Sequence, residues 1–225
     1  MEILENIPVR ASITEIKRRL HITRDNDLGL VRQLIDSSRS LIEAKALYNI
    51  CYIDEKLENA VRVDGLFLKS NVLRKNLDQV ERIFPYVVTI GPKFEEEMRD
   101  CPDLLKKYYL DTIGTLALTS ARKHLENHLR SKYALGKMAF MSPGSLADWP
   151  IQEQRPLFEL LANVEKAIGV KLTESLLMLP AKSVSGIYFP TETTFYSCQL
   201  CPRKECIGRK AAYNEKLAQE YGVLE

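Results

Sequence analysis

The sequence has no glycine-rich phosphate cradle, no long apolar run and almost no net charge. Its 10 glycines form neither G-x-G-x-x-G nor G-x-x-x-x-G-K-[ST], so neither standard nucleotide-binding loop is supported. No stretch approaches the roughly 18 apolar residues of a membrane span, and the opening MEILENIPVR lacks the basic and apolar regions of a secretory leader. The net charge of +2 gives no basic surface for nucleic acid. We therefore expect a cytoplasmic protein that binds neither nucleic acid nor a membrane.

Hydrolytic chemistry is also unsupported, because the chain has neither a Ser/His/Asp order nor a pair of carboxylates at catalytic spacing. What it does have is the composition of a folded soluble protein, with 45% hydrophobic and 28% charged residues over 225 positions. A chain of this length can bury a sizeable core. We expect one domain, with residues 1–196 as its body and residues 197–225 as a small C-terminal appendage.

Helices and strands alternate irregularly along the chain. Apolar residues at helical spacing and capping residues predict helices over residues 14–20, 26–45, 70–79, 103–132, 150–169 and 209–221, with another beginning at Pro92. Strand patterns cover residues 46–53, 86–90, 172–179 and 183–189, a segment after Gly136, and a hairpin over 60–68 with Asp64-Gly65 at its turn. Because hairpins rather than βαβ units connect the strands, the pattern favours an α+β fold on an antiparallel sheet.

Three of the five cysteines lie within nine residues, as Cys198-x-x-Cys201 followed by Cys206. This spacing suits thiolate ligation of one metal centre in a reducing compartment better than a disulfide framework. The predicted centre is an iron–sulfur cluster or structural zinc, with free redox thiols as the third alternative. A fourth ligand would have to be Cys51, Cys101, another side chain or an external group. Basic residues surround the motif and would favour thiolates: Arg203, Lys204, Arg209 and Lys210.

Other candidate groups have simpler structural interpretations. His124 and His128 stand four residues apart on the predicted long helix, yet the charged residues around them indicate a solvated face rather than a metal site. The Asp148-Trp149 pair is typical of a helix cap and a hydrophobic anchor for the helix that begins at Pro150, and it could also flank a planar ligand. Cys51 and Cys101 are typical of small buried hydrophobic residues.

A series of short motifs runs from Pro143 to Phe189. The most specific are Leu172-Thr-Glu-Ser175 and Ser183-Val-Ser-Gly-Ile-Tyr-Phe189. The others are Pro143-Gly144, Leu157-Phe158-Glu-Leu-Leu161, Gly169-Val-Lys171 and Pro180. In this order, over about 50 residues, they resemble the activation domain of cobalamin-dependent methionine synthase. The N-terminal 130 residues resemble that family only loosely, through the hairpin and the turn at Thr89 to Pro92.

The resemblance implies an antiparallel twisted sheet flanked by helices. In the synthase this domain binds S-adenosylmethionine and docks on the cobalamin domain while inactive cob(II)alamin is reduced and remethylated. Carried over position by position, the implied ligand-binding residues are Pro143, Gly144, Ser145, Glu174, Ser185, Gly186, Tyr188 and Tyr196. Glu174 stands between apolar residues of the predicted strand over 172–179, where such a group is more often solvent-facing or hydrogen-bonded; the alternative is a buried acid with a raised pKa.

Two of the matching positions depart from the family pattern. Phe140 stands where the family has an arginine able to grip the methionine carboxylate, and Ser145 stands where it has a tyrosine. A phenyl ring cannot replace the two-pronged bond of a guanidinium to a carboxylate. These differences argue against S-adenosylmethionine binding, whereas Tyr196 and the Pro143-Gly144 turn argue for it.

The sequence therefore predicts an accessory protein that assists reductive reactivation of a cobalamin-dependent methyltransferase, with the cysteine-ligated cluster as an electron relay. The expected partner is a corrinoid protein, or a methionine synthase without an activation domain of its own, because 225 residues leave no room for a cobalamin domain or a substrate barrel. Two alternatives stay open. One is a metal-stabilised binding module of the same fold, and the other is a small-molecule binder for a methionine-like or corrinoid ligand.

Overall fold

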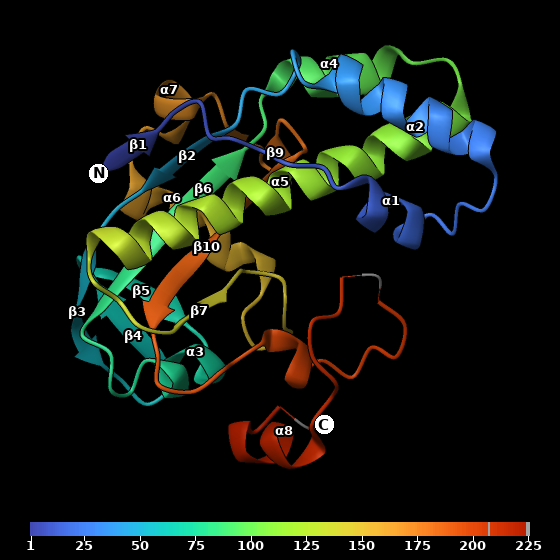
Figure 1. Ribbon diagram of the computed structural model, residues 1–225. Coiled ribbons are helices and arrows are strands. Elements are labelled where there is room, and N and C mark those ends of the chain that lie inside the picture. The colour runs from blue at the N-terminus through green and yellow to red at the C-terminus, as the bar shows by residue number, and fades with distance from the viewer. Residues whose placement is uncertain (207, 224–225) are drawn as a thin grey trace.

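The computed structural model describes residues 1–206 and 208–223, and its described part is organised around an antiparallel sheet (Figure 1). The N-terminal half supplies six of its strands and the C-terminal half supplies two. These are β1 (Glu2–Leu4), β2 (Lys45–Tyr48), β3 (Cys51–Lys56), β4 (Ala60–Val63), β5 (Leu66–Lys69), β6 (Arg82–Thr89), β7 (Met138–Met141) and β10 (Ser183–Pro190). The predicted α+β class with an antiparallel sheet and flanking helices is confirmed.

Strand β6 is the centre of the sheet. On one edge it pairs with β10, from Ser183 opposite Thr89 to Tyr188 opposite Phe84, and β7 continues the sheet beyond β10. On the other edge β2 and β3 follow one another, and β1 and the β4–β5 hairpin extend the sheet from them. The hairpin turns at Asp64 and Gly65, both at positive φ, as the sequence predicted.

Helices cover both faces of the sheet. One face carries α1 (Ile13–Arg19), α2 (Asp25–Ser38), α4 (Pro92–Asp100) and the long α5 (Leu104–Lys132), which crosses the strands in Figure 1. The other face carries α3 (Asn71–Asn76), α6 (Gln154–Leu161), α7 (Val164–Ile168) and α8 (Glu215–Tyr221). Alternate residues of β6 serve the two faces, because successive strand side chains point in opposite directions. Phe84, Tyr86 and Val88 face α5, whereas Ile83 and Val87 face the second layer.

The long helix α5 begins one residue after its predicted start at Asp103. Asp103 caps it by accepting the backbone N–H groups of Leu105 and Lys106 at 2.9 and 3.1 Å. Gly114 lets the helix approach α4 closely, because a Cβ there would lie 2.5 Å from the Phe94 ring. No helix within the described segments is long and apolar enough to cross a membrane, α5 included.

Several predicted elements are shorter than the sequence pattern indicated. The helix expected over 26–45 ends at Ser38, whose hydroxyl bonds the Leu34 carbonyl at 2.6 Å and so competes with continued helix. The strand expected over 46–53 is two strands separated at Asn49-Ile50. The helix expected over 150–169 begins with a 3-10 turn (Ile151–Glu153) and breaks at Ala162 and Asn163, both of which have positive φ.

Two further predictions were wrong about the C-terminal third. Residues 172–179 are not one strand but a hairpin of β8 (Lys171–Leu172) and β9 (Met178–Leu179), closed by the Thr173 hydroxyl, which accepts the Leu177 N–H at 3.0 Å. The helix expected over 209–221 is limited to α8, because Asn214 caps it. The strand β1 was not predicted, since three residues carry too little pattern.

The C-terminal segment packs against the body of the protein. Leu200 and Ala218 are buried in the hydrophobic core on the α3 side of the sheet. The Tyr221 ring stacks on the Phe195 ring, with 5.8 Å between the centroids. The Tyr221 hydroxyl also bonds the Asn76 side chain of α3 at 3.3 Å. The segment therefore covers α3, while the division at residues 196 and 197 stays a prediction.

Candidate functional site

The turn Ser142–Ser145 leaves the end of strand β7 in a fixed conformation. The Gly144 N–H bonds the Trp149 carbonyl at 2.8 Å, and the Ser145 hydroxyl bonds the Ser142 carbonyl at 2.6 Å. Gly144 has φ +79°, which favours glycine, and a Cβ there would lie 3.0 Å from Ile151. Pro143 is buried. The Pro143-Gly144 pair is thus a rigid turn at the edge of the sheet, as its residue types indicated.

Asp148 and Trp149 anchor the same loop. Asp148 does not cap the helix at Pro150, contrary to the sequence interpretation. Its carboxylate accepts the Ser70 hydroxyl and the backbone N–H of Val72, the latter at 3.0 Å, and so caps α3. Trp149 is fully buried, which agrees with its predicted role as a hydrophobic anchor. The C-terminal end of the loop is therefore held to the second layer.

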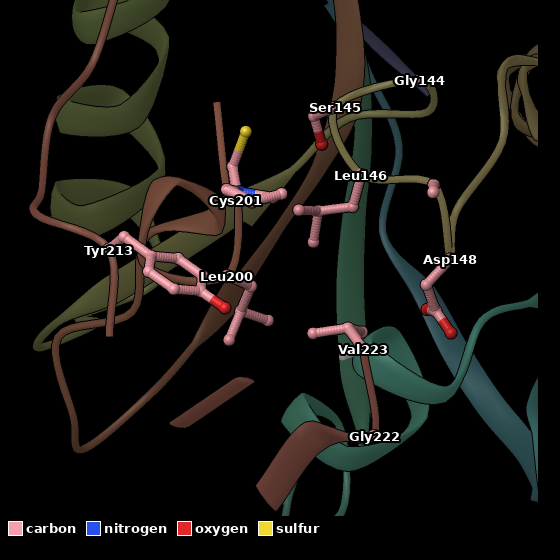
Figure 2. Close-up of a pocket in the computed structure, with 11 residues that line it drawn as sticks. Gly144, Ser145, Leu146, Asp148, Leu200, Cys201, Tyr213, Gly222 and Val223 are labelled. Atoms are coloured by element: carbon pink, nitrogen blue, oxygen red, sulfur yellow. The ribbon is translucent and has the colours of Figure 1, made fainter. Parts of the chain in front are cut away.

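Two cavities meet at Ser145. The larger, of 710 Å³, lies between the 144–148 loop and the C-terminal segment, and its walls include Leu146, Cys201 and Tyr213 (Figure 2). In Figure 2, Ser145 and Leu146 face Leu200 and Cys201 across this space. The smaller, of 190 Å³, is lined by Phe140, Ser142, Ser145, Tyr196, Ser197, Cys198, Gly208 and Lys210. Of the predicted ligand-binding residues, Gly144, Ser145 and Tyr196 line one or both of these cavities.

A third cavity, of 340 Å³, lies on the other side of the turn, and its lining includes Pro143 and Ser185. There the buried Gln154 amide donates to the Ser185 hydroxyl at 3.2 Å. Glu174 does not join this wall. It lies exposed in the β8–β9 turn, which confirms the interpretation as a solvent-facing group and excludes the alternative of a buried acid on a strand. Its backbone carbonyl accepts a hydrogen bond from Arg155 at 3.2 Å, and Glu174 is not among the residues that line these three cavities.

Gly186 and two stacked tyrosines lie beneath the turn. A Cβ at Gly186 would be 2.4 Å from the Met141 carbonyl and 3.0 Å from the Tyr86 hydroxyl, so only glycine fits. The Tyr86 and Tyr188 rings stack with centroids 4.7 Å apart. Burial raises the pKa of Tyr86, opposed by the Arg122 charge, and its hydroxyl has no hydrogen-bond partner in the described part of the chain. Gly186 and Tyr188 thus form the floor of the site rather than its walls.

Arg122 of α5 is the site residue that sequence reasoning missed. Only 9% of it is exposed; its Nη1 donates to the Tyr188 hydroxyl at 2.6 Å, and its guanidinium carbon lies 4.0 Å from the centre of the Phe140 ring. The signal was present, because Arg122 stands three residues before Leu125 and seven before Leu129 on the buried stripe of α5. A cation at such a position has a specific partner or a function.

Lys210 brings a second positive charge to Phe140. Its Nζ lies 4.5 Å from the centre of the ring. Burial lowers the pKa of Lys210 to about 8; the Arg122 charge lowers it further and Cys198 opposes the shift. Phe140, which stands where the resembling family has an arginine, is therefore flanked by two cations from other elements.

The three cysteines of the motif lie in different surroundings. Cys198 lines the smaller cavity, Cys201 lines the larger one, and Cys206 is exposed. Across residues 1–206 and 208–223, no three His, Cys, Asp or Glu side chains are grouped to hold a metal ion. Of the suggested fourth ligands, Cys51 is buried in β3, where burial raises its pKa to about 12, and Cys101 follows α4 on the opposite face. The donor set therefore does not fit a metal centre in this conformation.

Arg209 instead organises the cysteine segment. Its guanidinium donates to the carbonyls of Cys198 at 3.0 Å and Cys201 at 3.2 Å, and to those of Arg203 and Ala211. The backbone N–H of Lys210 also bonds the Cys198 sulfur at 3.4 Å. The segment is thus folded on itself around one guanidinium.

The two histidines of α5 are half-buried, not fully solvated as expected. His128 Nε2 lies 3.1 Å from the Tyr48 hydroxyl, which also donates to Glu2. Burial lowers the pKa of His128, and the Lys132 charge adds to this effect. His128 therefore belongs to a polar cluster that fastens β1 to α5.

Comparison with known proteins supports one family. The family described as vitamin B12 dependent methionine synthase, activation domain, matches residues 118–207. A crystal structure of the MetH reactivation domain bound to AdoHcy is similar over 87% of this chain and 81% of that chain, with a TM-score of 0.62 and 15% sequence identity. At this identity the structural likeness concerns the fold, and it extends over the N-terminal half, where the sequence resemblance is loose.

Proposed function

Since residues 118–207 belong to the family of vitamin B12 dependent methionine synthase activation domains, we propose that this chain acts in the reactivation of a cobalamin-dependent methyltransferase. The observation that carries the proposal is the position of the family match. It contains the second half of α5, strand β7, the 142–145 turn, strand β10 and Tyr196. Of these, strand β7, the 142–145 turn and Tyr196 contribute walls to the two cavities meeting at Ser145. The C-terminal residues that complete the walls, Gly208, Lys210, Tyr213, Gly222 and Val223, lie beyond the match.

An S-adenosyl compound is the proposed ligand of these cavities. The larger cavity lies within the range of about 300–1,000 Å³ typical of small-molecule sites. The smaller one adds hydroxyl groups from Ser142, Ser145 and Tyr196, and the buried Tyr86 hydroxyl beneath them has no protein partner among the described residues. S-Adenosylmethionine, when bound, supplies a methyl group, and the MetH reactivation domain of similar fold was crystallised with AdoHcy.

We interpret Phe140 and Ser145 as signs of a changed mode of ligand binding rather than of a loss of binding. The positive charge that the family's arginine would bring is supplied nearby by Arg122 and Lys210. We therefore include binding of an S-adenosyl compound in the proposed function, although Phe140 alone would argue against such binding.

The proposed partner is a corrinoid protein or a methionine synthase without its own activation domain. The decisive experiment measures affinity of the labelled chain for such a partner in two states of its cobalamin. We expect tighter binding when the partner holds cob(II)alamin than when it holds methylcobalamin, because reactivation requires the inactive state. Equal affinity for both states, or no binding, would reject the proposal in favour of a binding module that kept only the fold.

Ligand binding is tested with a matched pair of tyrosine variants. Tyr196→Ala removes a wall of the smaller cavity, whereas Tyr52→Ala removes a ring that is 62% exposed on β3. Calorimetry with S-adenosylhomocysteine should show weaker binding for Tyr196→Ala and unchanged binding for Tyr52→Ala. If both variants bind like the parent chain, the ligand does not occupy this cavity.

A cysteine-bound metal is kept as a separate proposal. Its support is the spacing of Cys198, Cys201 and Cys206. Because the thiols are not grouped in this structure, ligation would require the segment around Arg209 to rearrange. The proposed reactivation role therefore does not depend on a cluster.

A further inference from the structure

We infer that the cavity beneath the N-terminal segment binds an aliphatic carboxylate, with the hydrocarbon chain inside and the charged end at the two arginines of its mouth, Arg10 and Arg39. The cavity measures 580 Å³ and lies between residues 7–12, α2 with the turn that follows it, and α5. None of its described lining residues lines the cavities around the 142–145 turn. The inference therefore concerns a second site and does not rest on the proposed function.

The segment that closes the cavity is held in place although it forms neither helix nor strand. Residues 5–12 connect β1 to α1 and run along α5 (Figure 1). The Ile7 N–H bonds the Ala44 carbonyl at 3.1 Å, and the Arg10 N–H bonds the Ser120 hydroxyl of α5 at 3.0 Å. Because the segment is attached at two points, it encloses a space of defined shape together with the two helices.

The interior of this cavity is apolar, and its deepest residues are buried. Ile113 and Ala117 of α5 are 1% and 0% exposed, and Ile7 is 5% exposed. The other apolar side chains of the lining are half-buried: Val9, Ala11, Ile35 and Ile42. The volume lies within the range of about 300–1,000 Å³ typical of small-molecule sites. Such an interior favours a hydrocarbon chain, because each methylene moved into it from water strengthens binding by about fourfold.

The charge at the mouth of the cavity is positive. Arg10 and Arg39 are exposed there, and none of the described residues that line the cavity is acidic. Across residues 1–206 and 208–223, Arg10 forms no ion pair. Arg39 lies 3.4 Å from Asp36, but the two side chains are 76% and 69% exposed, so this pair contributes little and is easily displaced. Both guanidinium groups therefore have N–H donors to offer an anion.

A buried apolar interior and an exposed cationic mouth fit a ligand that is itself apolar at one end and anionic at the other. A carboxylate accepts two parallel N–H bonds from a guanidinium, whereas an ammonium group is repelled by it. Anionic lipids in a membrane carry the same chemistry at a flat surface. A chain that enters a cavity walled by three elements favours a free acid instead.

The ligand class is tested by calorimetry on the full chain with four monomeric probes: octanoate, decanoate, decanol and decyltrimethylammonium. We expect decanoate to bind with a stoichiometry of one and about tenfold more tightly than octanoate, because two further methylene groups are buried. Decanol should bind more weakly than decanoate, and decyltrimethylammonium should bind most weakly. Equal affinity for decanoate and decyltrimethylammonium would overturn the role given to the arginines.

The arginines are tested by three matched variants. Arg10→Met and Arg39→Met should each weaken decanoate by about twofold to fivefold, the range of an exposed charge pair, and leave decanol unchanged. Arg10 bonds Ser120 through its backbone, so this variant keeps the segment attached. Arg32→Met makes the same change at an exposed position of α2 outside the cavity and should bind like the parent chain. Unchanged decanoate affinity in both cavity variants contradicts the inference.

The position of the ligand is tested by filling the cavity. Ala11→Phe places a ring in it and should abolish decanoate binding, whereas Ala212→Phe, at an exposed position elsewhere, should not. Thermal unfolding shows whether each variant is folded; if Ala11→Phe is not, the arginine variants decide. Decanoate binding that survives in folded Ala11→Phe, or that Tyr196→Ala weakens instead, would place the ligand outside this cavity. Binding to phosphatidylglycerol vesicles without binding to decanoate would reject the free acid in favour of a membrane surface.

Discussion

The Asp148 carboxylate accepts a hydrogen bond from the backbone N–H of Val72 at 3.0 Å, across 76 residues of sequence. This bond ties the loop that forms one wall of the larger cavity to the first turn of α3. Asp148 thereby joins the stability of the second layer to the shape of the candidate site.

Replacing this cap should destabilise the protein. Asp148→Ala removes the acceptor for two backbone N–H groups and the Ser70 hydroxyl, and we expect the free energy of unfolding to fall by about 1–2 kcal/mol. Asp36→Ala, at an exposed carboxylate of α2, should change it by less than about 0.5 kcal/mol. Urea unfolding of both variants checks the prediction, and equal midpoints would contradict it.

Gly186 should not tolerate even a methyl group. Gly186→Ala would place Cβ 2.4 Å from the Met141 carbonyl, in backbone that cannot move without separating β7 from β10. We expect a loss of about 1–3 kcal/mol and disturbed ligand binding. Gly136→Ala is the control, since nothing lies within 4 Å of its added Cβ. A Gly186→Ala protein as stable as this control would show that the strands can adjust.

These two positions also show what sequence can and cannot predict. The strand with Gly186 and the Pro143-Gly144 turn were predicted because local patterns and family segments mark them. The partner of Asp148 was not, since a carboxylate near two helix starts can cap either one, and the choice of α3 depends on tertiary packing. Arg122 was missed for a similar reason: its role exists only once α5 lies over Phe140.

The errors in element length have physical causes as well. Hydroxyl and amide side chains compete locally with the backbone, so Ser38 ends a helix and Thr173 makes a turn where apolar spacing predicted continuation. The fold class was predictable because it depends on the order of many elements, and the hairpin at Asp64-Gly65 follows from the positive φ both residues accept.

Stability should fall in acid partly through Glu2. The bond from Lys132 lowers the pKa of Glu2 to about 2 against opposing burial, with further help from Tyr48 and Tyr133. Because the folded-state pKa lies below the ordinary value of 4.5, this stabilisation is present above pH 4.5 and is lost as the pH falls toward about 2. Glu2 is 39% exposed, so solvent screening keeps the effect small.

Glu2→Gln should therefore lower stability near neutral pH and flatten its acid dependence. Thermal unfolding midpoints are measured from neutral pH down through the window between pH 4.5 and about 2, in which the stabilisation by the carboxylate is lost, and give the difference from the parent chain. A constant difference across this range would mean that the charge of Glu2 contributes nothing.

The cysteine segment makes a prediction of its own. If a metal is bound, anaerobically purified protein should contain it, and Cys201→Ser should lose the metal and loosen the C-terminal segment while the main sheet stays folded. Cys101→Ser is the control, because Cys101 follows α4 on the opposite face. Elemental analysis decides: absence of iron, sulfide and zinc in the parent protein, or full metal content in Cys201→Ser, removes the site.

The function proposed for this chain is reactivation of a cobalamin-dependent methyltransferase. The most direct measurement incubates an inactive partner holding cob(II)alamin with a low-potential reductant and S-adenosylmethionine, with and without this chain, and records the visible spectrum and recovered methyl transfer. Reactivation that depends on the chain, and is weakened by Tyr196→Ala but not by Tyr52→Ala, is the predicted result. Equal recovery in the presence and absence of the chain would contradict the account.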